Sequence, residues 1–272
     1  MSTLRILWAF LVRDVKNAAS YRLLLFVQTT SVLTLSFTFF FLALMLRGVE
    51  GHIPSLQPYG GRYFGFALIG LALSGFLDAA LRAFSTSLRQ AQMTGTFAAM
   101  LATGAPLGAI VAGSGLYTLL FTTARAGLFF VLGATLFGLP FEGAQWGAAG
   151  VILALTVAVT GILGLFAAGF VVRYKQGDPI TAGLAGLSWL FSGVLYPKEI
   201  FPAPVQAMAS LLPLTHCLEG MRKAVLAGVP LAELSGSVAY LGGFLVVAGP
   251  VSLGWFLACV RGAKRAGTLG QY

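Results

Sequence analysis

The stretch that decides the fold runs from Ser192 to His216 and reads SGVLYPKEIFPAPVQAMASLLPLTH. It is too apolar for an ordinary solvent loop, yet prolines interrupt it too often for a membrane-spanning helix. These prolines are Pro197, Pro202, Pro204 and Pro213. Backbone that stops being helical at membrane depth must be buried in protein or line a watery cavity. The stretch therefore indicates a membrane protein that folds non-helical backbone into its own interior.

The composition of the whole chain supports a lipid environment. Of its 272 residues, 58% are hydrophobic and only 9% are charged, whereas soluble domains carry about 25% charged residues. No soluble core could absorb this much apolar surface, so part of the surroundings must be lipid. Only Cys217 and Cys259 are present, without a CxxC motif or a histidine cluster. We therefore expect no metal or redox site.

Six hydrophobic segments qualify as transmembrane helices, because about 20 apolar residues cross the hydrocarbon core of a bilayer. This predicts an all-α membrane protein whose residues 1–272 form a single transmembrane domain. The six segments are Leu23–Leu46, Tyr63–Phe84, Leu107–Phe137, Trp146–Val172, Ile180–Tyr196 and Gly236–Val260.

The basic residues predict the orientation, because cytoplasmic loops are enriched in lysine and arginine. With the N-terminus inside, eleven of the 17 basic residues are cytoplasmic, five are outside and Arg125 falls within a span. We expect a multi-pass protein of the cell membrane with both termini in the cytoplasm. The net charge of +9 is then mainly a topology signal, and nucleic-acid binding is not expected.

Residues 1–21 form a candidate interfacial helix before the first span. Five apolar side chains share one side of a helical projection, and the basic residues Arg5, Arg13 and Lys16 fall on the other. The apolar set is Leu4, Leu7, Trp8, Leu11 and Val15. Such a helix lies along the cytoplasmic membrane surface and contacts lipids. The alternative, a simple extension of the first span, would pull three basic residues toward hydrocarbon. No cleaved signal peptide is predicted.

Residues 85–106 form the longest predicted cytoplasmic loop. Thr94 or Thr96 could cap a short helix here. Its apolar patch, at helical spacing, would need a cover of lipid, of the chain itself or of a partner protein. The patch consists of Phe97, Met100 and Leu101.

Within this loop, GTFAAMLATGAP (Gly95–Pro106) resembles the G-T-L-E-x-L-L-x-(S/T)-P stretch in membrane subunits of type-2 ABC exporters. In that family the stretch forms a coupling helix that docks on the ATPase subunit. Ala98 stands where an acid is usual. The resemblance implies an ATPase-coupling set of Gly95, Thr96, Phe97, Met100 and Leu101.

On the outer side, residues 197–234 are predicted to form a re-entrant helical hairpin between the fifth and sixth spans. A helix should begin at Pro213 and end near Gly228, and Glu219 and Lys223 can pair on its surface, four residues apart. The alternative is a pair of helices on the outer surface.

The order of YPKEIFP, LLPLTHCLEGMRKAVLAG and a last span is similar to the C-terminal signature of type-2 ABC exporter permeases. Re-entrant helices there close the outer mouth of the translocation path. The resemblance implies an outer gate that includes Pro197, Pro202, Pro213, His216, Glu219 and Arg222.

Three charged residues fall inside predicted spans, where charges usually face a partner or a cavity. Asp78 is the natural partner of Arg82 or Arg125. We expect a buried pair that locks the second span to the third, rather than a substrate or proton site.

Catalysis by this chain is not expected. AGSGL (residues 112–116) places a serine between glycines, but the two histidines, His52 and His216, lie on the outer side, and no H-E-x-x-H motif occurs. An ion-coupled secondary transporter, or another non-enzymatic membrane protein, remains an alternative.

The sequence contains no G-x-x-x-x-G-K-[ST] loop, so this chain is not expected to bind ATP itself. The resemblance implies a dimer of such permeases, or a pair with a related permease, and separate ATPase subunits that bind ATP and Mg²⁺. No cofactor is expected in this chain. The substrate is expected to be amphipathic, and a lipid-linked glycan, another lipid, a peptide and a hydrophobic drug all stay open.

Overall fold

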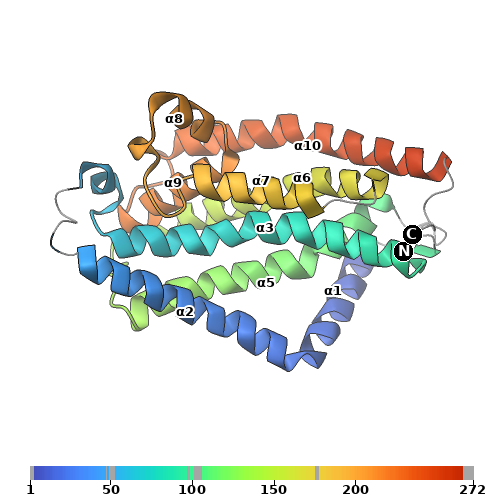
Figure 1. Cartoon of the computed structure of the whole chain (residues 1–272), viewed down its shortest axis with the longest axis horizontal. Helices are drawn as coiled ribbons and strands as arrows, with labels where there is room; N and C mark the ends of the chain where they lie inside the picture. The colour runs from blue at the N-terminus through green and yellow to red at the C-terminus, as the bar shows by residue number, and fades with distance from the viewer. Residues whose placement is uncertain are drawn as a thin grey trace.

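The computed structural model of the chain describes residues 3–46, 48, 53–96, 99–100, 106–174 and 178–265. These ranges form helices and connecting turns, with no strand among them. Five helices there are long and apolar enough to cross a membrane, and they run along the long axis of the molecule (Figure 1). They are α2 (Arg22–Leu46), α3 (Tyr63–Met93), α5 (Leu107–Thr135), α6 (Trp146–Tyr174) and α10 (Ser235–Arg265). The prediction of an all-α fold with several apolar spans is confirmed.

The fifth predicted span is shorter than expected. Helix α7 (Asp178–Phe191) has 14 residues and is about 21 Å long, less than the ~30 Å of a hydrocarbon core. It ends before Tyr196 because Gly193 turns the chain with a φ of +75°. A count of six crossings therefore stays a prediction.

Helix α3 occupies the centre of the bundle. It contacts α2, α5, α6 and α7. Of its most apolar stretch, 78% is buried, against 17% for α2. It approaches α6 closely at Gly164, where a Cβ atom would lie 2.6 Å from the carbonyl oxygen of Ala80. The two backbones touch here because glycine has no side chain.

Helix α3 is also longer than the predicted span. It continues beyond Phe84 to Met93, so the predicted loop of residues 85–106 begins with more than two turns of helix. The reason is that no glycine or proline follows Phe84 until Gly95, whose φ of +69° ends the helical path.

Helix α1 (Thr3–Ser20) is a separate element that forms a sharp angle with α2 (Figure 1). It packs on α5, where the Phe10 ring lies over Gly113, 2.8 Å from the position of a Cβ atom. Leu4, Trp8 and Val15 of the predicted apolar side remain exposed. An exposed apolar stripe suits a helix that lies on a membrane surface, and that location stays a prediction.

The segment between α7 and α10 forms three short helices: η3 (Lys198–Ile200), α8 (Ala203–Ser210) and α9 (Pro213–Leu226). Helix α9 packs against α3, α6, α10 and the 3-10 helix η2 (Pro54–Tyr59), and most of its residues are buried. It is therefore built into the bundle rather than laid on its surface. Helices α8 and α9 lie at the end of the molecule opposite the C-terminal ends of α3 and α10 (Figure 1).

Candidate functional site

The described residues between α3 and α5, which are 94–96, 99–100 and 106, are called the elbow below. The Thr94 hydroxyl donates a 2.9 Å hydrogen bond to the Gln90 carbonyl, and the Thr96 hydroxyl lies 3.3 Å from the Ala91 carbonyl. The two hydroxyls also lie 2.8 Å apart. Both threonines thus satisfy carbonyls at the C-terminal end of α3, and Thr96 is itself helical, so the expectation that one of them caps the next helix stays a prediction.

The structure describes only part of the predicted coupling set. Phe97 and Leu101 lie outside the described residues. Gly95 and Thr96 are exposed, and Met100 is partly buried. Contact of these residues with an ATPase subunit stays a prediction.

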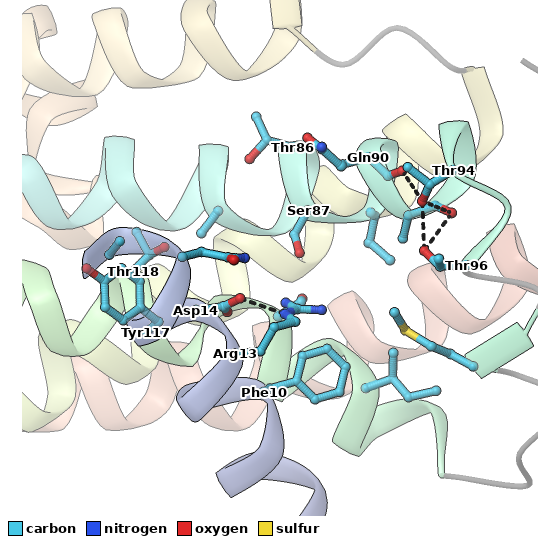
Figure 2. Close-up of a pocket in the computed structure, with 18 of the residues that line it drawn as sticks. Phe10, Arg13, Asp14, Thr86, Ser87, Gln90, Thr94, Thr96, Tyr117 and Thr118 are labelled. Atoms are coloured by element: carbon cyan, nitrogen blue, oxygen red, sulfur yellow. Dashed lines mark hydrogen bonds and ion pairs between the residues drawn. The ribbon is translucent and has the colours of Figure 1, made fainter. Parts of the chain in front are cut away.

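A cavity of about 520 Å³ opens beside the elbow, between α1, α2, α3 and α5 (Figure 2). This cavity was not predicted from the sequence, although polar residues within apolar segments can indicate one. These include Gln28, Tyr117 and Thr118.

One ion pair lies on the α1 side of this cavity. Arg13 Nε donates to Asp14 Oδ1 at 2.7 Å, and the guanidinium carbon lies 4.6 Å from the centroid of the Phe10 ring. Figure 2 shows Ser87 of α3 facing this pair. The cavity wall is therefore polar but locally neutral.

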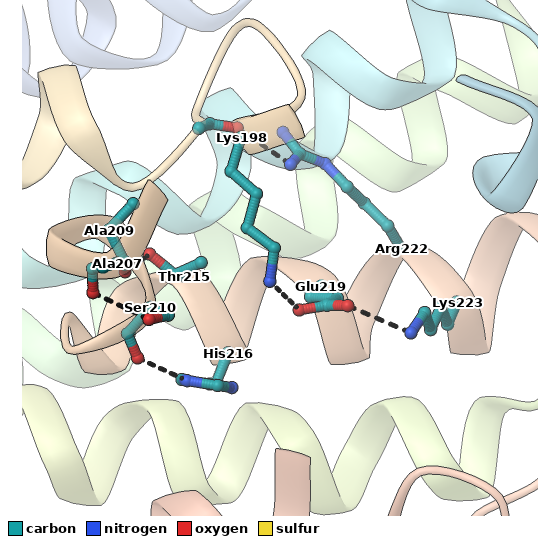
Figure 3. Close-up of polar contacts among 10 residues, drawn as sticks. Lys198, Ala207, Ala209, Ser210, Thr215, His216, Glu219, Arg222 and Lys223 are labelled. Carbon is teal, nitrogen blue, oxygen red and sulfur yellow. Dashed lines mark hydrogen bonds and ion pairs between the residues drawn. The ribbon is translucent and has the colours of Figure 1, made fainter. Parts of the chain in front are cut away.

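At the other end of the molecule, Arg222 of α9 is buried and anchors two other segments (Figure 3). Its Nη1 and Nη2 donate to the carbonyls of Gly193 and Val194, at 2.9 and 2.6 Å. Its Nε donates to the Phe66 carbonyl of α3 at 3.2 Å. Burial lowers the pKa of Arg222 to about 9, so the guanidinium remains charged at neutral pH and holds all three carbonyls.

Gly70 makes this anchor possible. A Cβ atom at Gly70 would clash with the carbonyl oxygen of Val194 and lie 2.7 Å from Arg222 Nη2. The turn after α7 can therefore reach the arginine only across a residue without a side chain. Neither Gly70 nor Phe66 could be singled out from sequence patterns alone.

Glu219, one turn before Arg222, joins two lysines. Its carboxylate accepts 3.0 Å hydrogen bonds from Lys198 of η3 and from Lys223 of α9, and the predicted pair of Glu219 with Lys223 is confirmed. Burial alone would raise the pKa of Glu219, but the hydrogen bonds from Lys223 and Lys198 outweigh it and lower the pKa. The carboxylate is thus held ionised between two cations.

The prolines of this region stand at helix starts. Pro197 and Pro202 are the N-cap residues of η3 and α8, and Pro213 occupies the first turn of α9. Proline is tolerated there because the first N–H groups of a helix have no partner within it. The interruptions that exclude a single span thus divide the segment into three short helices.

His216 ties α9 to its neighbours. Its Nε2 lies 2.9 Å from the carbonyl oxygen of Ser210, and its ring stacks on Tyr240 of α10 with centroids 3.8 Å apart. The Tyr240 hydroxyl donates to the Leu211 carbonyl at 2.7 Å. Tyr240 was not predicted, because its role depends on α10 returning beside the turn between α8 and α9.

The charges within the spans agree with the prediction in part, because Asp78 pairs with Arg82, one of its two expected partners. Asp78 accepts a 2.7 Å hydrogen bond from Arg82 within α3, and the two side chains are 50% and 65% exposed. Arg125 of α5 forms no ion pair with Asp78, although its guanidinium lies 3.6 Å from the Cβ position of Gly75. The expected buried lock between the second and third spans is therefore corrected to an exposed pair on one helix.

The two cysteines are buried and free. Burial raises the pKa of the Cys217 thiol to about 11, so it is unreactive at neutral pH. Among the residues that the structure describes, no group of three or more His, Cys, Asp or Glu side chains could hold a metal ion.

Comparison with protein families identifies the family of this chain. The model of the family described as ABC-2 type transporter matches residues 4–226, which include nearly all of α1, both ends of α3, the elbow and the contacts of Arg222. The chain belongs to the ABC-2 type transporter family. Comparison with curated proteins gives no match.

Membership of the ABC-2 type transporter family assigns the chain a role in transport as a membrane component. The apolar helices agree with a multi-pass membrane protein. The ABC-2 membrane component is not catalytic alone, and the family implies an ABC ATPase as partner. Helix α10 lies beyond the matched residues.

Proposed function

We propose that this chain is the permease subunit of an ATP-driven exporter and that two copies form the translocation path. The family match over residues 4–226 carries the proposal. The sequence contains no nucleotide-binding G-x-x-x-x-G-K-[ST] loop, so a separate ATPase subunit would bind ATP and Mg²⁺. That subunit would dock on the elbow, which we place in the cytoplasm, and move it.

Helix α3 offers a physical route from the elbow to the outer gate. Its 31 residues span about 46 Å. The Phe66 carbonyl at one end binds Arg222, and Thr94 follows the other end. A displacement of the elbow would therefore reach the contacts around Arg222 through one rigid helix. ATP binding can drive this only if it stabilises one of the two states more than the other.

The exposed ion pair of Asp78 and Arg82 supports a dimer. Charged side chains inside a membrane helix usually face a partner or a watery cavity, and in a single chain this pair is at least half exposed. A second copy across this face of α3 would remove the pair from lipid and place it beside the path. The predicted outer gate would close the far end of that path.

The substrate is proposed to be amphipathic. The cavity beside the elbow joins apolar walls to polar ones, where Arg13 and Asp14 pair with each other. It lies against α1, whose exposed Leu4, Trp8 and Val15 suit the cytoplasmic membrane surface. An amphiphile in the inner leaflet would have its headgroup at this level.

The test is copurification of the tagged full chain with its ATPase subunit, followed by ATPase measurement in nanodiscs. We expect two copies of each subunit in the complex. Met100→Glu should weaken the complex by placing a charge at the elbow, whereas Met208→Glu, at an exposed site on α8, should not. Ion-driven flux by the chain alone, without an ATPase, would instead support a secondary transporter.

A further inference from the structure

We propose that the cavity between α1, α2, α3 and α5 binds a membrane amphiphile whose headgroup is uncharged and rich in hydroxyl groups, as in a glycolipid. Its volume of about 520 Å³ is within the range of small-molecule sites, about 300–1,000 Å³. The inference deepens the proposed function by naming a substrate class. It rests on that function only for the role of the ligand as cargo.

The first reason is the number of polar side chains that lack a protein partner. Six residues from four helices line the cavity, and their side chains form no hydrogen bond within the described part of the chain. They are Asn17 of α1, Gln28 of α2, Ser87 and Gln90 of α3, and Tyr117 and Thr118 of α5. Each hydroxyl or amide can both donate and accept a hydrogen bond. Sugar hydroxyls offer the same two roles and would complement this wall.

The second reason is charge. Among the described residues that line the cavity, Arg13 and Asp14 are the two charged ones, and they pair at 2.7 Å. A phosphate headgroup would meet the Asp14 carboxylate beside the arginine, and like charges repel. An uncharged headgroup avoids this repulsion. It can donate a hydroxyl hydrogen to Asp14 and accept from the remaining N–H groups of Arg13.

The third reason is the apolar part of the site. Phe10, Tyr21 and Leu25 contribute apolar surface to the lining, and Leu23 and Phe26 on the adjoining turn of α2 are exposed. A headgroup in the cavity would leave its acyl chains to run along this exposed part of α2. The site therefore matches a two-part ligand better than a free sugar.

The experiment uses the purified full chain in nanodiscs of phosphatidylcholine. The probe is glucosyl diacylglycerol with a diazirine on its headgroup, and labelled peptides are located by mass spectrometry. We expect labelling on peptides of α1, α3 and α5. Excess unlabelled glucosyl diacylglycerol should displace the probe, and phosphatidic acid should not.

Two variants remove polar groups without leaving a partner unsatisfied. Gln90→Leu and Tyr117→Phe should each reduce labelling by about fivefold, the usual effect of one lost hydrogen bond. The matched control is Gln145→Leu, at an exposed position before α6, and it should label like the natural protein. Equal displacement by phosphatidic acid, or unchanged labelling in both variants, would overturn the proposal.

A second measurement separates cargo from a resident lipid. If the glycolipid is cargo, it should raise the ATPase rate of the full complex in nanodiscs, and less so in Gln90→Leu. If it is a bound structural lipid, it should leave the rate unchanged. Both results support binding at this cavity. Labelling without any copurifying ATPase would contradict the proposed function and leave the binding site standing.

Discussion

Arg222 contacts Phe66 in two ways, although 156 positions separate them in the sequence. The guanidinium carbon lies 3.4 Å from the centroid of the aromatic ring, and Nε donates to the Phe66 carbonyl oxygen at 3.2 Å. The remaining donors hold the turn after α7. One side chain thus joins α9, α3 and that turn.

Arg222→Lys should destabilise the protein by about 2–4 kcal/mol. A lysine ammonium lacks the planar fork of arginine, so buried carbonyls would lose partners, at about 1–3 kcal/mol each. Thermal unfolding in detergent, followed by size-exclusion fluorescence, would measure the change. Arg261→Lys is the matched control, because Arg261 also donates to a carbonyl but is exposed. Similar midpoints for the two variants would contradict the anchoring role.

Gly70→Ala should also destabilise the protein. The added methyl group would overlap the Val194 carbonyl oxygen, and overpacking of this kind costs about 1–3 kcal/mol. The control is Gly127→Ala, within α5, where nothing lies within 4 Å of the Cβ position. That variant should be slightly stabilised, because alanine favours helix by about 1 kcal/mol over glycine. The prediction fails if both variants unfold at the temperature of the natural protein.

The Glu219 carboxylate should give stability that depends on pH. Because its folded pKa is lowered, its contribution is fully present above the ordinary carboxyl pKa of about 4.3. It is lost as the pH falls through the lower folded value. Glu219→Gln should lack this part of the acid transition and lose about 1 kcal/mol at neutral pH, since both lysines are partly exposed.

Unfolding midpoints of the natural protein and Glu219→Gln, measured from pH 7 down to pH 3, would test this prediction. The two curves should converge at the acid end. Glu233→Gln, in an exposed turn, controls for the loss of one carboxylate. Parallel curves over the whole range would exclude a contribution from the two lysine pairs.

Gly95→Ala should weaken coupling to the ATPase subunit. Gly95 has a φ of +69° with open space around it, so the cost is conformational, about 1–2 kcal/mol. The elbow would shift to relieve it. We expect lower ATPase stimulation and less copurified ATPase than for Gly108→Ala, where a Cβ atom also meets nothing within 4 Å. Equal coupling in the two variants would argue against docking at the elbow.

Asp78→Asn should affect assembly more than folding. The pair with Arg82 is exposed and lies within one helix, so its loss should change the stability of one chain by about 0.5 kcal/mol or less. Between two copies, however, it would remove the carboxylate that accepts from Arg82 at the interface. Chemical cross-linking in nanodiscs should therefore show fewer dimers. A normal dimer fraction would contradict the placement of this face at a subunit interface.

The sequence predicted the long helices well because their signals are local. Apolar length gave α2, α5, α6 and α10 to within a few residues, and the proline at the start of α9 and Gly228 near its end bounded that helix. It missed the last turns of α3, because polar residues such as Thr86 and Gln90 were taken as loop when they continue the helix toward the cavity.

Site residues were harder to predict because their partners are distant in sequence. The pair of Glu219 with Lys223 follows from helical spacing, whereas the bond from Lys198 depends on how η3 folds back. Arg222 was expected to lie at an outer gate. The structure shows its side chain buried among backbone carbonyls. Nothing in the spacing of residues reveals a carbonyl oxygen as a partner.

The contact of Gly164 with Ala80 has a mechanical consequence. Where two backbones touch with no side chain between them, neither helix can slide or rotate past the other without steric overlap. The central pair, α3 and α6, should therefore behave as a single stiff spine during any working cycle. Larger rearrangements would be left to outer helices such as α2, whose apolar stretch is only 17% buried.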